Sequence, residues 1–481
     1  MADRKKPGDY RYYREARENI AYYNGHDLFR VAWIGPTVPE SSENADKKLA
    51  ELKRVFQAHN VLRELTDNWR NGLISQPFQW HLKDSQGERV EASEAEKVLQ
   101  RWIDHVEQQA IYQDPCKTDF ELSDPWAEFV TQVGVAGEGS LRLWQPAKFA
   151  EMDDPVQRIH LHVPRIGAVV VERDNDGFID SVKYNYGIEL ETQTMDPSGV
   201  VSVDTSSRED PFVIETGGRW LIQQIRMPSL FTDSAKRKQG SICHALTMKL
   251  RNQELGGFKE RTFLNAEFPT DDDGEPIEIT RGPGIDQYAY GIPQGDDNSP
   301  QYTTPTMVES DPVSVDTFID SINTDLQLLY REFRQGHLLA DADGGLSGES
   351  RIQMRQNFEL YLKAWKRPIE SAIANILNIV LRLLNYTELE AVVQLNITTG
   401  KLSSDERQAV INEFGAALLS KATALAQLDS VDDVDAELAL IKEEAEEAMQ
   451  SRPEPLPRNP IEETDDDEDS EDEPDDDSQP E

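Results

Sequence analysis

Cysteine and long hydrophobic runs are scarce in this sequence of 481 residues. Cys116 and Cys243, the two cysteines, lie far apart, which is not the spacing of a disulfide framework and favours a reducing cytoplasm. The longest apolar region, 373–384, is interrupted by polar residues that include Asn375 and Asn378, and no apolar stretch follows the basic N-terminus. We therefore expect neither a membrane span nor export by a signal peptide.

The signature motifs of common enzymes are also missing. The sequence has no Gly-x-x-x-x-Gly-Lys-Ser/Thr phosphate loop, no Gly-x-Ser-x-Gly elbow and no His-Glu-x-x-His pair. Segments 271–274 and 341–344 begin like calcium loops but lack an acidic ligand at the twelfth position, so we interpret them as turns. His160 and His162 share one face of an expected strand, yet no third metal ligand can be named. We expect a non-enzymatic protein without cofactor or metal.

Positive charge is in short supply. The chain has 49 Lys and Arg against 90 Asp and Glu, a net charge of −41. Residues 462–481 hold fourteen of the acids and no base, which leaves −41 + 14 = −27 for the rest. Like-charge repulsion without apolar content predicts a disordered tail over 455–481. The remaining acidic body is not expected to grip nucleic-acid phosphates, because that requires clustered Lys and Arg.

The chain is too long for one core, and two to four domains are expected. Its N-terminal half starts with helical patterns and then changes to a period of two, with a turn at 174–177. We predict helices over 10–25, 50–73 (bent near Asn60) and 93–109, and a β-rich module over 126–227.

The second half is dominated by long helical patterns around a turn-rich segment. A helix over 233–255 stops at paired glycines, a small β insertion follows, and a helix over 312–333 returns. A glycine-rich loop over 336–348 precedes the longest helical pattern, 349–384, which Pro368 is expected to kink. The expected C-terminal elements are a strand over 391–395 and two short helices within 404–448.

The order of these elements resembles that of portal proteins of tailed bacteriophages, the head-to-tail connectors of the virion. Segment 346–350, Leu-Ser-Gly-Glu-Ser, looks like the Ser-Gly signature before the long helix of that family, and the Gly-Pro-Gly at 282–284 lies where its clip should be. Segment 61–77 resembles the family's helix and following turn, and 129–143 resembles its next helix and strand.

The resemblance implies an α+β fold, mainly helical, with wing, stem, clip and crown, assembled as a ring. The expected parts are the wing (1–232), first stem helix (233–257), clip (258–310), second stem helix (311–334), tunnel loop (335–348), kinked wing helix with its strand (349–400), crown (401–454) and acidic tail (455–481).

The resemblance also implies a structural function. Portal subunits form a dodecameric channel at one capsid vertex, through which double-stranded DNA passes without sequence specificity during packaging and ejection. The implied partners are the terminase large subunit, the head-tail adaptor, and the major capsid and scaffolding proteins, with no membrane contact. The protein would be located in the virion after assembly in the host cytoplasm. Two alternatives remain open: a metal-dependent nuclease or hydrolase, and another head-tail structural protein.

Three sets of residues are candidates for these contacts. For the channel-facing loop they are Arg334, His337, Asp341 and Asp343. For a clip surface that docks the terminase they are Asp271, Asp272, Asp273 and Glu275. The third set lies in a basic stretch, 234–261, which could contact DNA, pair with acidic faces of a neighbouring subunit, or form a solvated helix face; its members are Lys236, Arg237, Lys238, Lys249 and Arg251.

Overall fold

The structure is a computed structural model of the chain. It describes residues 7–26, 28, 53–75, 77–90, 93–111, 120, 122, 124–145, 149, 151–185, 190–206, 211–257, 261–267, 270, 290–294, 301–309, 313–343, 348–399, 404–418, 420–428, 437–438 and 440–443. These residues fall into two compact units, Met1–Gly400 and Lys401–Glu481. Helices and strands both contribute to the first unit, in agreement with the predicted α+β class.

Helices are the largest class of secondary structure in the first unit. In the described part of this unit they are α1 (Pro7–Tyr23), α4 (Val61–Ile74), α5 (Glu94–Ile111), α6 (Pro125–Ala136), α7 (Pro155–Arg158), α8 (Asp233–Gly257), α9 (Val315–Glu332), α10 (Gly336–Asp343) and α11 (Gly348–Leu383). The helices predicted from periodicity over 93–109, 233–255, 312–333 and 349–384 are confirmed as α5, α8, α9 and α11.

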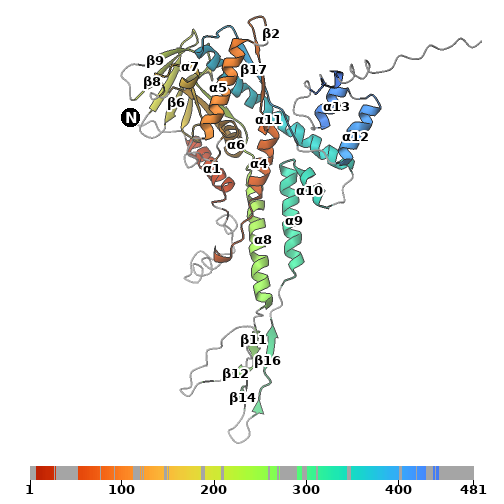
Figure 1. Ribbon diagram of the computed structural model, residues 1–481. Helices are drawn as coiled ribbons and strands as arrows, with labels where there is room; N and C mark the ends of the chain where they lie inside the picture. The colour runs from red at the N-terminus through yellow and green to blue at the C-terminus, as the bar shows by residue number, and fades with distance from the viewer. Residues whose placement is uncertain are drawn as a thin grey trace, which may run out of the picture. The chain divides into compact units, whose positions relative to one another are not determined.

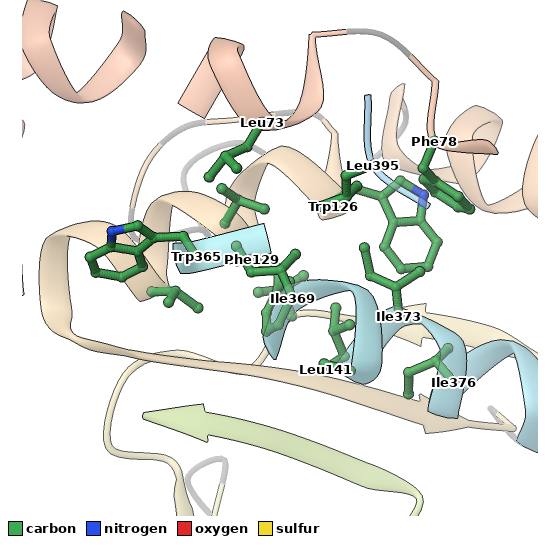
Figure 2. Close-up of a cluster of buried hydrophobic side chains, with 14 of the residues drawn as sticks. Leu73, Phe78, Trp126, Phe129, Leu141, Trp365, Ile369, Ile373, Ile376 and Leu395 are labelled. Atoms are coloured by element: carbon green, nitrogen blue, oxygen red, sulfur yellow. The ribbon is translucent and has the colours of Figure 1, made fainter. Parts of the chain in front are cut away.

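The hydrophobic core lies between α11 and the helices and strands that precede α8. Figure 2 shows Ile369, Ile373 and Ile376 of α11 beside Phe129 of α6 and Leu141 of the strand that follows it. All five side chains are buried. Complete burial of each such side chain stabilises the fold by roughly 1.5–3 kcal/mol, which fixes α11 in place. We name the first unit without α8, α9 and the segment between them the body.

Edge-to-face aromatic pairs extend this core. The rings of Trp69 in α4 and Trp365 in α11 are 5.0 Å apart between centroids, and those of Phe78 and Trp126 are 5.3 Å apart. Such pairs add roughly 0.5–1.5 kcal/mol beyond their burial. The first pair therefore joins α11 to α4, and the second joins Phe78 to α6, in each case across a long stretch of sequence.

Three antiparallel sheets complete the body. A three-stranded sheet has the order β17 (Glu390–Gln394), β1 (Gln79–Lys83), β2 (Arg89–Val90), and a second has β10 (Ile222–Arg226), β3 (Glu138–Trp144), β4 (His160–His162). The third is a meander in chain order: β5 (Val169–Arg173), β6 (Ile179–Asn185), β7 (Leu190–Met195), β8 (Val200–Thr205) and β9 (Phe212–Glu215).

The β5–β6 and β7–β8 turns of the meander share one sequence pattern, Asp-x-x-Gly. The carboxylate of Asp174 accepts the backbone N–H groups of Asp176 and Phe178 at 3.0 and 2.8 Å. Gly177 follows with φ +90°, a value that favours glycine. The carboxylate of Asp196 repeats the arrangement with residues two and four positions later. The turn predicted at 174–177 is confirmed, with the carboxylate holding the loop closed.

Two expectations from periodicity need correction. The helix expected over 50–73, with a bend near Asn60, is interrupted instead: residues 53–55 are helical, 56–60 are not, and α4 begins at Val61. The Asn60 side-chain oxygen accepts the Arg63 N–H at 3.2 Å and caps α4. The β-rich module expected from 126 starts with α6 instead. Asp124 caps α6, Pro125 lies in its first turn, and nearly all its residues are buried, so no amphipathic period marks it as a helix.

The β insertion between α8 and α9 is also confirmed in the described residues. It consists of two-stranded pairs: β11 (Arg261–Leu264) with β16 (Thr306–Glu309), β12 (Ala266–Glu267) with β13 (Tyr290–Gly291), and β14 (Pro293–Gln294) with β15 (Gln301–Tyr302). Figure 1 shows α8 and α9 side by side, with these strands beyond their ends.

The segment after α9 differs from the expectation of a loop over 336–348. Its first part forms helix α10, and α11 then runs on through Pro368. Leu338 and Leu339 lie within α10, where they support helix formation, whereas the glycines at 344 and 345 follow its last residue. The glycine-rich composition of 336–348 thus predicted a loop where the first eight residues form a helix.

The second unit is helical where it is described. The sequence predicts two short helices within 404–448; the structure has α12 (Ser404–Gly415) and α13 (Lys421–Leu428), which contact each other, and residues 437–438 and 440–443 are helical as well. The acidic tail expected over 455–481 lies outside the described residues. No helix in the described part of the chain is long and apolar enough to cross a membrane.

A buried asparagine couples α11 to β17 and provides a test of the core. The Asn378 side chain donates to the Ala391 carbonyl oxygen at 3.2 Å and accepts the Ala391 N–H at 2.6 Å. We expect Asn378→Ala to lower the free energy of unfolding by about 2 kcal/mol, because both backbone groups lose their partner in a buried site. Calorimetry of the variant measures this. Asn375→Ala is the control, since Asn375 is half-buried and bonds a side chain at 3.2 Å; an equal loss in both variants would contradict the argument.

Candidate functional site

The antiparallel helices α8 and α9, with the β insertion between them, form the candidate site, which we name the helix pair. At one end of the pair, which we name the body end, the start of α8 contacts the end of α9. At the other, which we name the insertion end, the end of α8 contacts the residues just before α9. At ~1.5 Å per residue the two helices span roughly 37 and 27 Å.

A carboxylate clamps the body end. The Glu332 carboxylate accepts hydrogen bonds from the Lys238 ammonium group at 2.6 Å, from the Ser234 hydroxyl at 3.3 Å and from the Thr232 hydroxyl. Burial acts to raise the pKa of Glu332, but the hydrogen bonds from Lys238 and Thr232 outweigh it, so the pKa is lowered. Glu332 therefore stays ionised near neutral pH and holds α9 to α8.

A side-chain amide clamps the insertion end. The Asn252 nitrogen donates to the Val313 carbonyl oxygen at 2.7 Å, and its oxygen accepts the Val313 N–H at 2.9 Å. This pattern imitates one step of an antiparallel ladder, and it satisfies the backbone just before α9 begins. The helix pair is thus fixed at both ends.

Helix α4 anchors the helix pair to the body. The Gln239 side chain of α8 accepts the Leu62 N–H at 3.2 Å, and the Gln335 side chain donates to the Leu65 carbonyl oxygen at 2.6 Å. The Tyr330 hydroxyl donates to the Glu64 carboxylate at 2.8 Å, and burial together with this bond raises the pKa of Tyr330. Both helices are therefore attached to the same two turns of α4.

The basic set predicted on α8 divides into paired and outward residues. Lys236 is 8% exposed, with the carboxylates of Glu18 and Asp233 at 3.4 and 3.6 Å, and Lys238 binds Glu332. These two ammonium groups have partners inside their own chain, and the contact predicted for them with DNA or a neighbouring subunit stays a prediction. Arg237 is exposed, and Lys249 and Arg251 are half-buried.

The channel-facing set is also divided. Arg334 is exposed and has φ +60°, in the turn between α9 and α10. His337 is only 6% exposed, and its ring lies 5.3 Å from that of Phe358; its brief contact to phosphate stays a prediction. The backbones of Asp341 and Asp343 belong to α10. The four predicted clip acids, Asp271, Asp272, Asp273 and Glu275, lie outside the described residues.

Sequence reasoning missed the residues that hold the helix pair, namely Glu332, Asn252, Gln239, Tyr330 and Gln335. Each bonds a group between 61 and 270 positions away. Glu332 is one of four acids in α9 and carries no local signal that sets it apart. The other four look like ordinary polar or aromatic helix residues.

The histidines considered as metal ligands pack as ring contacts. The His160 ring stacks on Phe149 with centroids 4.5 Å apart, and the His162 ring lies 6.0 Å from that of Tyr184. Burial lowers the pKa of each to about 4. Within the described segments no group of three or more His, Cys, Asp or Glu side chains is placed to hold a metal ion.

Comparison with known proteins gives similarity only at the level of structure. No protein-family model and no curated protein matches the chain. A chain from the neck of an empty gene transfer agent particle, computed with C6 symmetry, is similar with a TM-score of 0.37 and 14% identity. A chain from the virion of a native gene transfer agent particle is similar with a TM-score of 0.39 and 13% identity. Each similarity covers 79% of this chain and 92% of the other.

Proposed function

We propose that this chain is a portal-type subunit: copies form a ring at one capsid vertex, and double-stranded DNA passes through the ring during packaging and ejection. The observation that carries the proposal is the helix pair with its β insertion, followed by α10 and the long helix α11. In this proposal α8 and α9 are the stem, the insertion is the clip, the body is the wing and the second unit is the crown.

The hydrogen bonds and the ion pair at the ends of the helix pair support its proposed role as a stem that resists mechanical force. Glu332 and Asn252 hold α8 and α9 together at both ends, and Gln239, Tyr330 and Gln335 attach the pair to α4. A channel wall has to resist the push of moving DNA without unfolding. A two-helix strut with fixed ends meets that requirement better than a single exposed helix, which is marginal in water.

Simple geometry agrees with a channel for DNA. Twelve inner helices at a spacing of ~10 Å give a circumference of roughly 120 Å and an axis-to-axis diameter of about 38 Å. Subtraction of one helix diameter, ~10 Å, leaves an opening of about 28 Å. Duplex DNA fits this opening with a layer of water.

The charge of the chain supports passage without tight binding. Outside residues 462–481 the net charge is −41 + 14 = −27. DNA carries one negative charge per ~1.7 Å of its axis, so strong basic contacts would slow it and make its binding depend steeply on salt. An acidic wall repels the duplex and keeps it near the axis.

The partners of this proposal are the terminase large subunit, a head-tail adaptor, and capsid and scaffolding proteins. The terminase ATPase would supply the energy for DNA movement. We assign its docking surface to the clip acids Asp271, Asp272, Asp273 and Glu275, and a channel-facing role to Arg334 after α9.

Imaging of the purified full-length chain tests the proposed function. We expect closed rings with a central hole in negative-stain micrographs, and a mass of about 650 kDa (12 × 54.5 kDa) by light scattering. The alternative function, a metal-dependent nuclease or hydrolase, does not require a ring of this kind. Solitary monomers, or compact dimers without a hole, at every protein and salt concentration tried would contradict the proposal.

A further inference from the structure

The two helices of the pair carry opposite charge. Helix α8 has five Lys or Arg against two Asp or Glu, a net charge of 5 − 2 = +3. Helix α9 has one Arg against four Asp or Glu, a net charge of 1 − 4 = −3. Lys238 and Glu332 form an ion pair at the body end, and Lys236 pairs with the carboxylates of Glu18 and Asp233 in its own chain. The charges that matter for a contact between copies are therefore sought at the insertion end.

The charges at the insertion end lie at one level along the pair. Arg251 is next to Asn252, whose side chain bonds the backbone of Val313. Asp316 is three residues after Val313, within one helical turn, and Asp320 is one turn farther along α9. Arg251 and Asp316 therefore lie at similar heights, but on different helices.

These charges point away from the partner helix. With about 100° between successive residues, Arg251 lies about 140° around α8 from Lys238, which faces α9. On α9, Asp316 and Asp320 lie about 160° and about 120° around the axis from Glu332, which faces α8. Opposite sides of one helix pair thus present a positive and a negative charge.

The exposure of these side chains agrees with an uncovered contact surface. Asp316 and Asp320 are exposed and have no ion-pair partner among the described residues. Next to them, Val313 is 54% exposed and Ile319 is 38% exposed. On α8, Met248 is half-buried and lies one turn before Arg251, on the same face. Each side of the pair therefore combines charge with apolar surface, which is typical of an interface.

We propose that these two sides meet between copies of the chain: Arg251 and Met248 of one copy pack against Asp316, Ile319 and Asp320 of the next. A second copy is the occupant because every chain carries both complementary sides. Such a head-to-tail contact repeats in one direction and closes into a ring when the rotation allows. This inference rests on the proposed function and specifies the contact that builds its stem.

The body end does not contribute charge attraction to this contact. Arg237 on α8 and Arg331 on α9 are both exposed there and have the same sign. Arg251 has a contact within its own chain, but a guanidinium group has five N–H donors and can serve two partners. The attraction between copies is thus concentrated at the insertion end.

Charge reversal separates a contact between copies from one within a chain. We expect Arg251→Glu alone, and Asp316→Lys with Asp320→Lys alone, to raise the protein concentration needed for half-maximal ring formation about tenfold or more, because like charges then face each other. Co-expression of the two variants under different affinity tags should restore rings that contain both tags. In an alternating ring each contact again joins opposite charges.

Rescue by co-expression distinguishes a contact between copies from a contact within one chain. If only a chain carrying all three substitutions forms rings, and the mixture does not, the contact lies within one chain and the inference is overturned. Wild-type ring formation by each variant alone also overturns it, while leaving the proposed ring intact. Absence of rings from the wild-type chain would instead contradict the proposed function.

Arg331→Glu is the matched control. It makes the same change of charge on an exposed α9 position, but at the body end, and is expected to form rings as the wild-type chain does. Circular dichroism and thermal unfolding of every variant confirm that the subunits are folded. A loss of rings in Arg331→Glu as large as in Arg251→Glu would overturn the assignment to the insertion end.

Discussion

Glu191→Ala is expected to lower the free energy of unfolding by about 3–5 kcal/mol, because it leaves the guanidinium group of Arg142 buried without its counter-ion. The Glu191 carboxylate accepts two N–H groups of Arg142, at 3.1 and 2.5 Å. Neither side chain is more than 8% exposed. Calorimetry and the hydrogen exchange of β6, β7 and β8 measure the loss.

The aromatic surroundings of Arg142 explain why a replacement cannot simply be solvated. The guanidinium carbon lies 4.6 Å from the Tyr184 ring centre and 5.0 Å from that of Trp144. These rings exclude water from the cation and add cation–π attraction. The ion pair is a polar joint between β3 of one sheet and β7 of the meander, so its loss should loosen the meander first.

A control on the other side of the meander tests this explanation. Glu172 binds Lys183 at 2.7 Å, but both side chains are partly exposed, at 40% and 32%. Glu172→Ala should therefore change the free energy of unfolding by no more than about 1 kcal/mol. The combined variant Arg142→Met with Glu191→Leu should recover most of the stability, because both charges of the buried pair are then removed together. An equal loss from Glu172→Ala and Glu191→Ala would refute the argument.

The elements of the helix pair could be predicted because their signals are local. The apolar stripe of α9 repeats every three or four residues, and α8 ends at the glycines at 256 and 257, as the sequence indicates. The Asp-x-x-Gly turns of the meander are local in the same sense, since the carboxylate of Asp174 bonds only the next four residues. Patterns of this kind need no knowledge of the tertiary fold.

Elements and contacts that depend on distant partners could not be predicted from periodicity and local signals. Helix α6 is buried on nearly every side, so its sequence shows no amphipathic period. Lys236 looked like part of a solvated basic face, but its partner Glu18 lies 218 positions away. Glu332 and Lys238 are 94 positions apart. The sequence therefore predicted which helices form the candidate site, but not which of their charges remain available.

This distinction matters for the proposed ring. A count of basic residues on α8 suggested one continuous surface, whereas the structure pairs Lys236 and Lys238 within the chain. Of the charges that remain outward, Arg251 on α8 finds the opposite sign in Asp316 and Asp320 on α9 near the insertion end, whereas Arg237 and Arg331 at the body end have the same sign. Intrachain pairing at the body end thus restricts charge attraction between copies to the other end of the helix pair.

Acidification is expected to destabilise the body through His162. Burial, together with the nearby Arg142 guanidinium, lowers the pKa of His162 to about 4. In the unfolded chain the pKa is about 6.5, so as pH falls below 6.5 the unfolded state binds the proton first and folding loses stability until about pH 4. Between pH 7 and pH 5 this amounts to about 2 kcal/mol for His162. Denaturant unfolding of wild type and His162→Gln across this range measures it, and the variant should show a shallower decline.

Comparison with the variant is necessary because other groups titrate nearby. His160, whose pKa burial also lowers to about 4, contributes in the same direction. Burial raises the pKa of the Glu138 and Asp124 carboxyl groups, and these oppose the loss because the folded state binds their protons more tightly. His26, an exposed histidine after α1, provides the control: His26→Gln should follow the wild-type decline. Nδ1 of His162 is buried without a hydrogen-bond partner in the described residues, so a proton there gains no hydrogen bond and lies near the Arg142 guanidinium. Identical pH dependence in wild type and His162→Gln would exclude this mechanism.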